Sequence, residues 1–407
     1  MGEIVRYNYR LRPGVTAERA LLSEWHRCRY LWNEAVHQDK LGNRPTSAKL
    51  GKLLTAARAA NAWLKDGSQN AQQCTLNNYA HALGRSFKEK GSGSPKAKSR
   101  KKSLPSLEYT TRGFRLRDGR LVLAKGVSIP VVWSRELPSR PTSVRIYRDS
   151  LGHWYGSFVV RRKSATAPEI DASIGIDWGV STIATTTRAE YDLPYRGHRK
   201  RCAAELARAQ RKMSRRRRKS GVQSNGYRRA KRLAARLYKR AFRQTQHDSR
   251  VWAKRIVEDH ELIAVEDFKP KFLAKSTMAR KASDAAIGAA KRELIQRAER
   301  AGRRVVSVTP AYTTMTCAEC FGRINQRLGL TNRNFRCAAC GHRDNRDRNA
   351  ARVILAVAER GHASVEDMRH SRLPFQVVAV RSELEIPTVD PSGAAKTGIP
   401  IVSRPGR

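Results

Sequence analysis

The stretch SIGIDWGVST, residues 173–182, decides how this chain folds. Its apolar residues predict a strand that ends at Asp177 and turns at Gly179, and the β-branched run at 182–187 predicts an antiparallel return strand. Such a hairpin would hold the Asp177 carboxylate at the rim of a sheet, on rigid backbone and facing solvent. A single Asp-x-Gly after a strand is a weak signal, since Asp177 could equally be a turn former. Its meaning therefore depends on the rest of the chain.

Two more acidic residues stand where they could meet Asp177. Glu266 ends a continuous apolar strand at 261–268, as expected of a parallel strand covered on both faces, and Asp347 lies in the first turn of a predicted last helix. In a ribonuclease-H-like fold these places converge at one sheet edge. Clustered carboxylates repel one another unless they bind divalent cations, and two Mg²⁺ ions about 4 Å apart can activate water and stabilise the leaving 3′ oxygen of a phosphodiester. The pattern predicts a magnesium-dependent nuclease, with Asp177 shared by both ions and Glu266 and Asp347 binding one each.

These carboxylates also have structural explanations. Glu266 could be solvated at a strand end, and Asp347 could be an acid favoured at a helix N-terminus. Three neighbouring acids, Asp267, Asp284 and Asp344, lie near the same edges and are the alternatives to the predicted set.

The charge of the chain indicates its partner. The 407 residues include 82 Lys and Arg against 35 Asp and Glu, a formal net charge of +47. Nucleic acid relieves this self-repulsion, because neutralised phosphates release their counterions. Charge alone does not separate an enzyme from a basic protein that only coats RNA. It does count against actin-like sugar kinases, whose first phosphate loop resembles residues 175–182 but whose second Asp-x-Gly loop and Gly-rich adenosine site are missing from the sequence.

Four of the seven cysteines form the strongest motif. Two CxxC pairs separated by residues 321–336 fit the spacing C-x2-C-x15–20-C-x2-C, which is typical of zinc in a reducing cytosol rather than of disulfides. Four thiolates leave no position open for water, so the pattern predicts one structural Zn²⁺. The predicted ligands are Cys317, Cys320, Cys337 and Cys340. The sequence contains no run of about 18 apolar residues that would span a membrane, and its start lacks the apolar core of a signal peptide.

The N-terminal part changes from a helical to a strand period. After a strand at 6–11, apolar residues recur at helical spacing from Thr16 and again within 63–87, and residues 91–102 are typical of a flexible basic linker. The following strands would form a small barrel or sheet that closes by about residue 165. They are expected at 114–116, 120–123, 128–133, 143–147 and 154–160.

A basic helical hairpin is expected between the two halves of the nuclease sheet. Residues 199–219 contain eleven basic residues and one acid, with a narrow apolar stripe at helical spacing. The successive side chains of 215–218 would point around most of a helix turn, which suits a groove with phosphates on several sides. The stripe is Cys202, Leu206, Ala209 and Met213, the second helix would turn Ala230, Leu233, Leu237 and Ala241 inward, and the candidate nucleic-acid contacts are Arg215, Arg216, Arg217, Arg218 and Lys219.

The remaining elements complete an α/β pattern. A helix is expected at 285–301 and a buried strand at 305–308, before the cysteines and the last helix. The inward residues of the first of these helices would be Ala286, Ala289, Leu294 and Ala298. Residues 363–407 have the composition of a disordered tail, with at most a short strand at 375–380.

At these motifs the chain resembles the TnpB family, the RNA-guided nucleases of bacterial insertion sequences, and the compact type V CRISPR effectors descended from it. The matching pieces are GIDWGV at 175–180, AVEDF at 264–268, AYTTMTCAEC at 311–320, CAACG at 337–341 and DRNAA at 347–351. In two places the chain departs from the family: Cys320-Phe321-Gly322 replaces the usual Cys-Gly, and Thr314-Met315 stands where Ser-Gln is common. Neither involves a carboxylate, so activity is expected to be retained.

The resemblance implies a multidomain α/β protein. It would contain a RuvC-like (ribonuclease-H-like) nuclease domain with an inserted zinc ribbon, and an N-terminal wedge β-barrel with a helical recognition insert. The implied divisions are a first wedge strand at 1–15, the recognition insert at 16–90, a basic linker at 91–105, the wedge barrel at 106–165, the nuclease domain at 166–310 with its hairpin at 199–257, the zinc ribbon at 311–345, the final nuclease helix at 346–362 and the tail at 363–407.

The resemblance also implies a function. The chain would bind a guide RNA, recognise a short motif beside its target in double-stranded DNA, and cut both strands in one site that holds two Mg²⁺ ions. We expect a prokaryotic cytoplasmic, nucleoid-associated protein that does not bind membranes. Its oligomeric state stays open between a monomer and a homodimer on one RNA. The alternatives are a nuclease-inactive RNA-guided DNA-binding protein, and a transposase that uses the same carboxylates for strand transfer.

Overall fold

The structure is a computed structural model that describes residues 2–43, 45–89, 92–100, 103–163, 168–268, 276–323, 333–360 and 377–379. The described residues form two compact units, one that ends at Lys163 and one made of the residues after it. The predicted disordered tail at 363–407 lies outside the described residues, except for the short strand at its centre.

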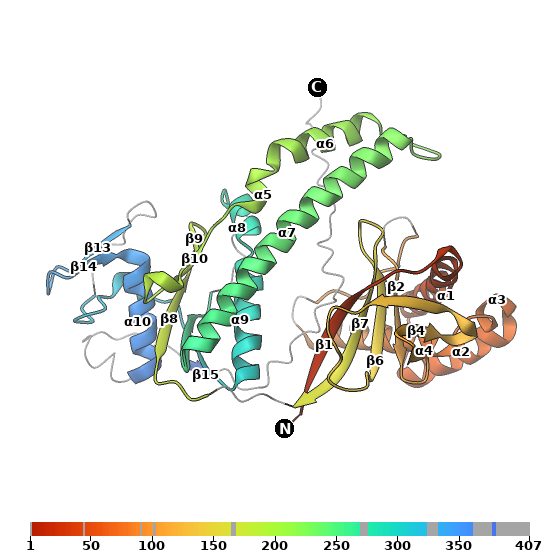
Figure 1. Cartoon of the computed structure of the whole chain (residues 1–407), viewed down its shortest axis with the longest axis horizontal. Helices are drawn as coiled ribbons and strands as arrows, with labels where there is room; N and C mark the ends of the chain where they lie inside the picture. The colour runs from red at the N-terminus through yellow and green to blue at the C-terminus, as the bar shows by residue number, and fades with distance from the viewer. Residues whose placement is uncertain are drawn as a thin grey trace. The chain divides into compact units, whose positions relative to one another are not determined.

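Seven antiparallel strands of the first unit curl into a near-closed barrel (Figure 1), in the order β2-β6-β7-β1-β5-β4-β3. Alternate side chains of these strands enclose one apolar interior, which contains Tyr9, Leu121, Ile146 and Phe158. The strands are β1 (Gly2–Leu11), β2 (Ser106–Thr110), β3 (Phe114–Arg117), β4 (Arg120–Leu123), β5 (Ser128–Val132), β6 (Ser143–Arg148) and β7 (Trp154–Lys163), and a short 3-10 turn, η1 (Ala124–Gly126), links β4 to β5.

Four helices follow β1 in the same unit. They are α1 (Val15–Lys40), α2 (Ser47–Ala60), α3 (Ala62–Lys65) and α4 (Gln69–Lys88). Their mutual core includes Leu31, Leu64, Leu76 and Tyr79, whereas Trp25 and its neighbours on α1 pack on the barrel. The helical prediction is therefore confirmed, with a break that separates α3 from α4.

The predicted flexible linker makes specific contacts where it is described. Trp32 Nε1 on α1 donates a hydrogen bond to the Lys96 carbonyl (3.0 Å). The Asn33 side chain accepts a hydrogen bond from the Lys98 N–H (2.7 Å) and donates one to the Lys98 carbonyl (3.1 Å). The Lys98 ammonium also lies 3.5 Å from the centre of the Trp32 ring. Residues 92–100 thus have no helix or strand, as expected, but they are bound along α1.

The second unit is built on a sheet with the order β10-β9-β8-β11-β12-β15. Strands β8, β11 and β12 are parallel, and β9 returns antiparallel to β8 as the sequence predicts. The strands are β8 (Ser173–Trp178), β9 (Thr182–Thr186), β10 (Leu193–Pro194), β11 (Leu262–Glu266), β12 (Arg304–Val308) and β15 (Val377–Ala379), and the small pair β13 (Asn334–Arg336) and β14 (Arg343–Asn345) lies apart from the main sheet.

Helices cover both faces of this sheet. One face carries Ile176 and Val265 and packs against α7 and α9, and the other carries Ala264 and Val306 and packs against α10. The helices are α5 (His198–Arg201), α6 (Ala203–Arg215), α7 (Asn225–Asp259), α8 (Ala279–Ala285), α9 (Ile287–Ala301) and α10 (Arg346–Arg360), with 3-10 turns η2 (Ala189–Tyr191) and η4 (Thr313–Met315).

The inward faces of two helices differ from the prediction. Leu294 and Ala298 of α9 are buried as predicted, but Ala286 adopts a left-handed conformation (φ 52°) between α8 and α9, so Ile287 and Ala290 are buried in place of Ala286 and Ala289. On α7 the predicted inward residues are buried except Leu233, which is 37% exposed, and Ala234 is buried in its place. In both helices the real break or register depends on tertiary contacts that periodicity does not reveal.

Candidate active site and cysteine cluster

The sheet brings two of the predicted carboxylates together. Val265 of β11 pairs with Ile176 of β8 in parallel register, so the following residues, Glu266 and Asp177, are neighbours at the carboxyl ends of adjacent strands. Because side chains alternate along a strand, both acids point to the face that α10 covers. Glu266 and Asp177 are only 7% and 8% exposed, respectively, and the negative charge of Glu266 acts on the Asp177 carboxyl group.

A glycine lets α10 approach this face. A Cβ atom placed on Gly175 would lie 2.1 Å from the carbonyl oxygen of Ala351, so only glycine fits between the strand and the helix backbone. Asp347, in the first turn of α10, lies near enough for its charge to act on Asp177, but among the described residues only the four cysteines form a group close enough to hold a metal ion as they stand. Asn345 caps this turn, since its side-chain oxygen accepts hydrogen bonds from the Asp347 and Arg348 backbone N–H groups (3.0 and 3.3 Å).

Asp347 is held by cations. Arg333 donates a hydrogen bond to its Oδ2 atom (2.6 Å), and Arg346 lies 3.5 Å from Oδ1. Arg333 also reaches Ser181 after β8 (3.4 Å), and Lys281 reaches the same hydroxyl (3.2 Å). Positive side chains therefore surround the three acids at the sheet edge.

Burial and mutual repulsion perturb the acids. Burial raises the pKa of Asp177 well above its usual value, and the negative charges of Glu266 and Asp347 add to this effect. Burial likewise raises the pKa of Glu266 to about 7, although the Trp178 backbone N–H and Lys291 act in the opposite direction. The expectation that Asp177 faces solvent is wrong, because α10 covers its face of the sheet.

The three alternative acids have other partners. Asp267 pairs with Lys291 (3.2 Å), and Asp344 pairs with Arg352 (3.1 Å). Asp284 accepts hydrogen bonds from the Arg199 and Lys200 backbone N–H groups at the start of α5 and from the Tyr195 hydroxyl (2.8 Å). These contacts give each of them a structural role.

The four predicted cysteines form a compact cluster, with all Sγ atoms within 4.8 Å of one another. Cys317 and Cys340 are 3.7 Å apart and Cys320 and Cys337 3.6 Å. Tetrahedral ligands at a Zn–S distance of about 2.3 Å would be about 3.8 Å apart, so the spacing fits a structural zinc ion. Burial would raise the pKa of Cys337, but hydrogen bonds from the Cys340 and Ala339 N–H groups outweigh it and lower this pKa to about 7, whereas burial raises the pKa of Cys317 to about 12.

Each cysteine pair is followed by a residue whose backbone has the left-handed conformation. Gly341 (φ 75°) has this role after the second pair, and Phe321 (φ 55°) has it after the first. Phe321 is the residue by which the sequence departs from the TnpB pattern. Its buried ring packs with Val353 and Ile354 of α10, so the departure adds a contact between the cysteine segment and this helix.

Asn349 connects the cysteine cluster to α10. Its side chain is fully buried, accepts a hydrogen bond from the Ala318 N–H (2.9 Å) and donates one to the Thr316 carbonyl (2.6 Å). These two backbone groups flank Cys317, and Asn349 lies two residues after Asp347. The amide therefore ties one cysteine ligand to the turn that carries the third acid.

The basic run of the hairpin is placed differently from the prediction. Helix α6 ends at Arg215, so Arg216–Lys219 lie in the turn before α7 and do not project around a helix. All five side chains are exposed, but Arg218 also bonds the Val222 carbonyl (3.2 Å) inside the turn. The apolar stripe of α6 is confirmed, since Leu206, Ala209 and Met213 pack against α7.

Sequence reasoning missed the residues that support the site. Arg333, Lys291 and Asn349 act through contacts with distant segments, and nothing in the sequence around Arg333 and Lys291 indicated this. The signal that could have found Asn349 is its position in the DRNAA motif, where an amide follows the acid on a buried helix.

Two family models match the chain. The model described as "Probable transposase" (OrfB_IS605) matches residues 157–277, and the model described as "Cas12f1-like, TNB domain" matches residues 288–354. The first match contains β8 and β11, and the second contains the cysteine cluster and the start of α10.

Curated proteins and a solved structure are also similar. A Streptomyces pristinaespiralis protein named "Putative RNA-guided DNA endonuclease" is 33% identical over 291 residues, which are 70% of this chain and 71% of that protein. The Escherichia coli (strain K12) protein "Putative RNA-guided DNA endonuclease InsQ" is 27% identical over 89% of this chain and 94% of its own length. The protein in a structure titled "Cryo-EM structure of the Cas12f1-sgRNA-target DNA complex" aligns with 87% of this chain and 98% of its own, at 12% identity and a TM-score of 0.48.

Proposed function

The chain belongs to the TnpB/OrfB family of RNA-guided DNA endonucleases related to Cas12f, and from this premise we propose that it binds a guide RNA and cuts both strands of a matching DNA duplex in one magnesium-dependent site. The guide would select the target by base pairing, next to a short motif that the protein reads. The proximity of Asp177, Glu266 and Asp347 carries the proposal.

The donor set fits divalent cations. Two neighbouring buried carboxyl groups, on one of which the charge of a third also acts, would be stabilised as anions by bound cations. Two Mg²⁺ ions, when bound, would supply a nucleophilic water and stabilise the leaving oxygen. Asp177 interacts with both of the other acids, which suits the shared ligand, while Glu266 and Asp347 would each hold one ion.

The chain's own residues would prepare this site. Helix α10 excludes solvent from the face that carries Asp177, and Asn345 fixes the turn that presents Asp347. Lys291 donates to the Glu266 carbonyl (3.1 Å) and keeps the end of β11 in place. Arg333 and Lys281, which reach the Ser181 hydroxyl, are positioned to attract a phosphodiester to the acids.

We further propose a domain assignment for the two units. The near-closed barrel and its four helices would be the wedge domain with its recognition insert, and the second unit would be the RuvC-like nuclease with a zinc ribbon between β12 and α10. The exposed cations of the hairpin turn would contact phosphates. Among the described residues, no helix is long and apolar enough to cross a membrane.

Cleavage with a guide tests the function. The protein is purified from cells that express it with its flanking DNA, and the RNA that accompanies it is sequenced. Plasmids with and without the sequence complementary to this RNA are then incubated with protein and Mg²⁺. Linear product only from the matched plasmid is expected, and Asp177→Ala should bind the same RNA without cutting.

The two alternative functions predict different results in these experiments. Guided binding without cleavage by the native protein would favour the nuclease-inactive DNA-binding protein, and joined DNA products would favour strand transfer. Purification without any defined RNA would contradict guided cleavage. We favour the endonuclease because all three predicted acids are present and the charges of Glu266 and Asp347 both act on Asp177.

A further inference from the structure

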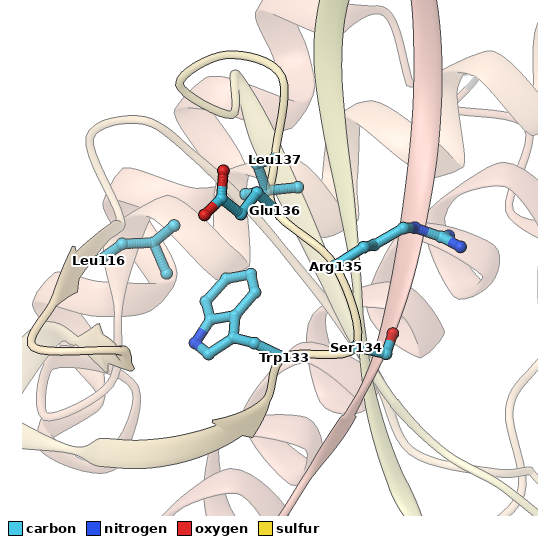
Figure 2. A pocket seen from close by; sticks show the side chains of 6 residues that line it. All are labelled: Leu116, Trp133, Ser134, Arg135, Glu136 and Leu137. Carbon is cyan, nitrogen blue, oxygen red and sulfur yellow. The ribbon is translucent and has the colours of Figure 1, made fainter.

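A cavity on the barrel has the features of a site for one base. The segment after β5 lines a space of about 620 Å³ (Figure 2) whose walls are Leu116, Trp133, Ser134, Arg135, Glu136 and Leu137. The space is shallow and largely open to solvent. Apart from Leu116, all these residues belong to one short stretch, 133–137, so the cavity has a defined local framework.

Trp133 forms a fixed platform in the cavity. Its indole N–H donates a hydrogen bond to the Gly119 carbonyl (2.7 Å), and its ring packs on Tyr9 and Phe158, with centroid distances of 4.8 and 5.8 Å. The side chain nevertheless remains 36% exposed. A rigid, partly exposed aromatic ring is suited to stacking on an unpaired nucleobase, because little entropy is lost when the base binds.

Neighbouring contacts hold the rest of the segment in place. The Tyr9 hydroxyl donates a hydrogen bond to the Arg135 carbonyl (3.2 Å). The Arg135 guanidinium lies 4.6 Å from the centre of the Tyr7 ring on β1, and Figure 2 shows it pointing away from the indole. Arg135 is exposed, so it also offers a positive charge to a phosphate beside the cavity.

Glu136 places a negatively charged carboxylate at the cavity. Its carboxylate is exposed, has no ion pair within the described ranges, and is turned toward the space between Leu116 and Trp133 (Figure 2). In a chain with a net charge of +47, an acid that no cation neutralises repels phosphate and accepts hydrogen bonds. Guanine is the base that presents two adjacent donors, N1–H and the 2-amino group, to a carboxylate.

We propose that this cavity, which we call the Trp133 pocket, binds an unpaired guanine of the guide RNA. The base would stack on Trp133 and donate two hydrogen bonds to Glu136, while Arg135 would contact the adjoining phosphate. RNA is the source because sequence-specific RNA recognition uses splayed, unpaired bases stacked on aromatic rings. The assignment rests on the proposed function only in naming the RNA as the guide.

Binding of short RNAs tests the pocket. Full-length protein, freed of RNA at high salt, is titrated with fluorescent uridine octamers that contain one central guanine, inosine or adenine. Because one good bidentate contact discriminates by about tenfold or more, the guanine octamer should bind about ten times tighter than the adenine octamer, with inosine between. Glu136→Gln should remove this preference, and Trp133→Ala should weaken binding of the guanine octamer about tenfold.

Controls separate the pocket from folding and from the nuclease. Trp133→Phe keeps an aromatic platform and should retain most of the affinity. Equal binding of all three octamers by the native protein, or a guanine preference that survives Glu136→Gln, would overturn the proposal. Tighter binding of the matching deoxyribonucleotide octamer would overturn the assignment to RNA. Guided plasmid cleavage, measured on the same preparations, reports the proposed function separately.

Discussion

At the scale of single residues, the strongest constraint is the pair Asp177 and Glu266. Both have a raised pKa in the folded chain, so the folded state binds protons more tightly than the unfolded state. Their contribution to stability is therefore fully present below their ordinary pKa values and is lost as pH rises toward about 7 for Glu266. A magnesium-free protein should carry this penalty at neutral pH, and cations should remove it.

We predict a pH-dependent effect of magnesium on thermal stability. In magnesium-free buffer with zinc retained, Asp177→Asn should be more stable than the native protein at pH 8 and nearly equal to it at pH 4.5. The difference should grow as the pH rises from 4.5 to 8, because the unfolded state loses these protons at a lower pH than the folded state does. Adding Mg²⁺ should raise the native Tm at pH 8 and leave the variant unchanged.

The exposed acid Glu190 provides the matched control. Glu190→Gln should leave both the pH dependence and the magnesium effect as they are in the native protein. If native protein and Asp177→Asn unfold at the same temperature at pH 8 without magnesium, the two carboxyl groups do not repel each other as described.

A second prediction concerns Gly175, where β8 meets the backbone of α10. Gly175→Ala would place a methyl carbon 2.1 Å from the Ala351 carbonyl, so the helix must move away from the strand. We expect a loss of about 2–3 kcal/mol in unfolding free energy, in the range of overpacked cores, and at least a tenfold loss of cleavage because Asp347 moves with the helix. Gly84→Ala in α4, where nothing lies within 4 Å, should be neutral or stabilising. Equal effects of the two substitutions in denaturant melts would refute the close contact.

At the scale of elements, the sequence predicted the strands and motifs that a short run of residues is enough to mark. Strand β11 is a continuous apolar run because both its faces are covered. The cysteine cluster was predicted because the spacing of the two CxxC pairs is visible in the sequence itself. Strand β2 was missed because only Leu107 and Tyr109 mark its alternation directly after a linker. The burial of Asp177 was missed because the helix that covers it lies about 170 residues further along the chain, and no local pattern reports such a contact.

The link between the cysteine segment and α10 gives a third prediction. Asn349→Ala would leave the buried Ala318 N–H and Thr316 carbonyl without their partner, at a cost of about 1–3 kcal/mol each. Zinc should therefore leave faster in the presence of a chelator, and magnesium-dependent cleavage should fall, whereas RNA binding should persist. Zinc release followed with a colorimetric indicator and cleavage followed on plasmid measure the two effects. Asn225→Ala, at an exposed position, is the control, and unchanged zinc release in Asn349→Ala would contradict the coupling.

At the scale of the whole molecule, we expect the net charge of +47 to dominate the proposed association with nucleic acid. If six or more phosphates are neutralised, affinity for RNA should fall about 10³-fold or more between 50 and 200 mM salt. Replacing Arg215, Arg217 and Lys219 by Gln should lower the slope of log K against log salt by about one for each phosphate that the variant no longer binds. Asp177→Asn should keep the native slope. An unchanged slope in the triple variant would exclude the hairpin turn from the RNA-binding surface.

The hairpin has a consequence for how such proteins vary in size. Its tip has a small core of its own, formed by Leu206, Met213, Ala230 and Leu237, whereas the sheet is covered by a later portion of α7 that includes Trp252 and Ile256. Shortening, lengthening or exchanging the arm beyond the sheet would therefore leave the sheet and its three acids in place. The hairpin of α6 and the first part of α7 is therefore a place where another segment could be grafted, and where related proteins could differ in length, without a change in the sheet.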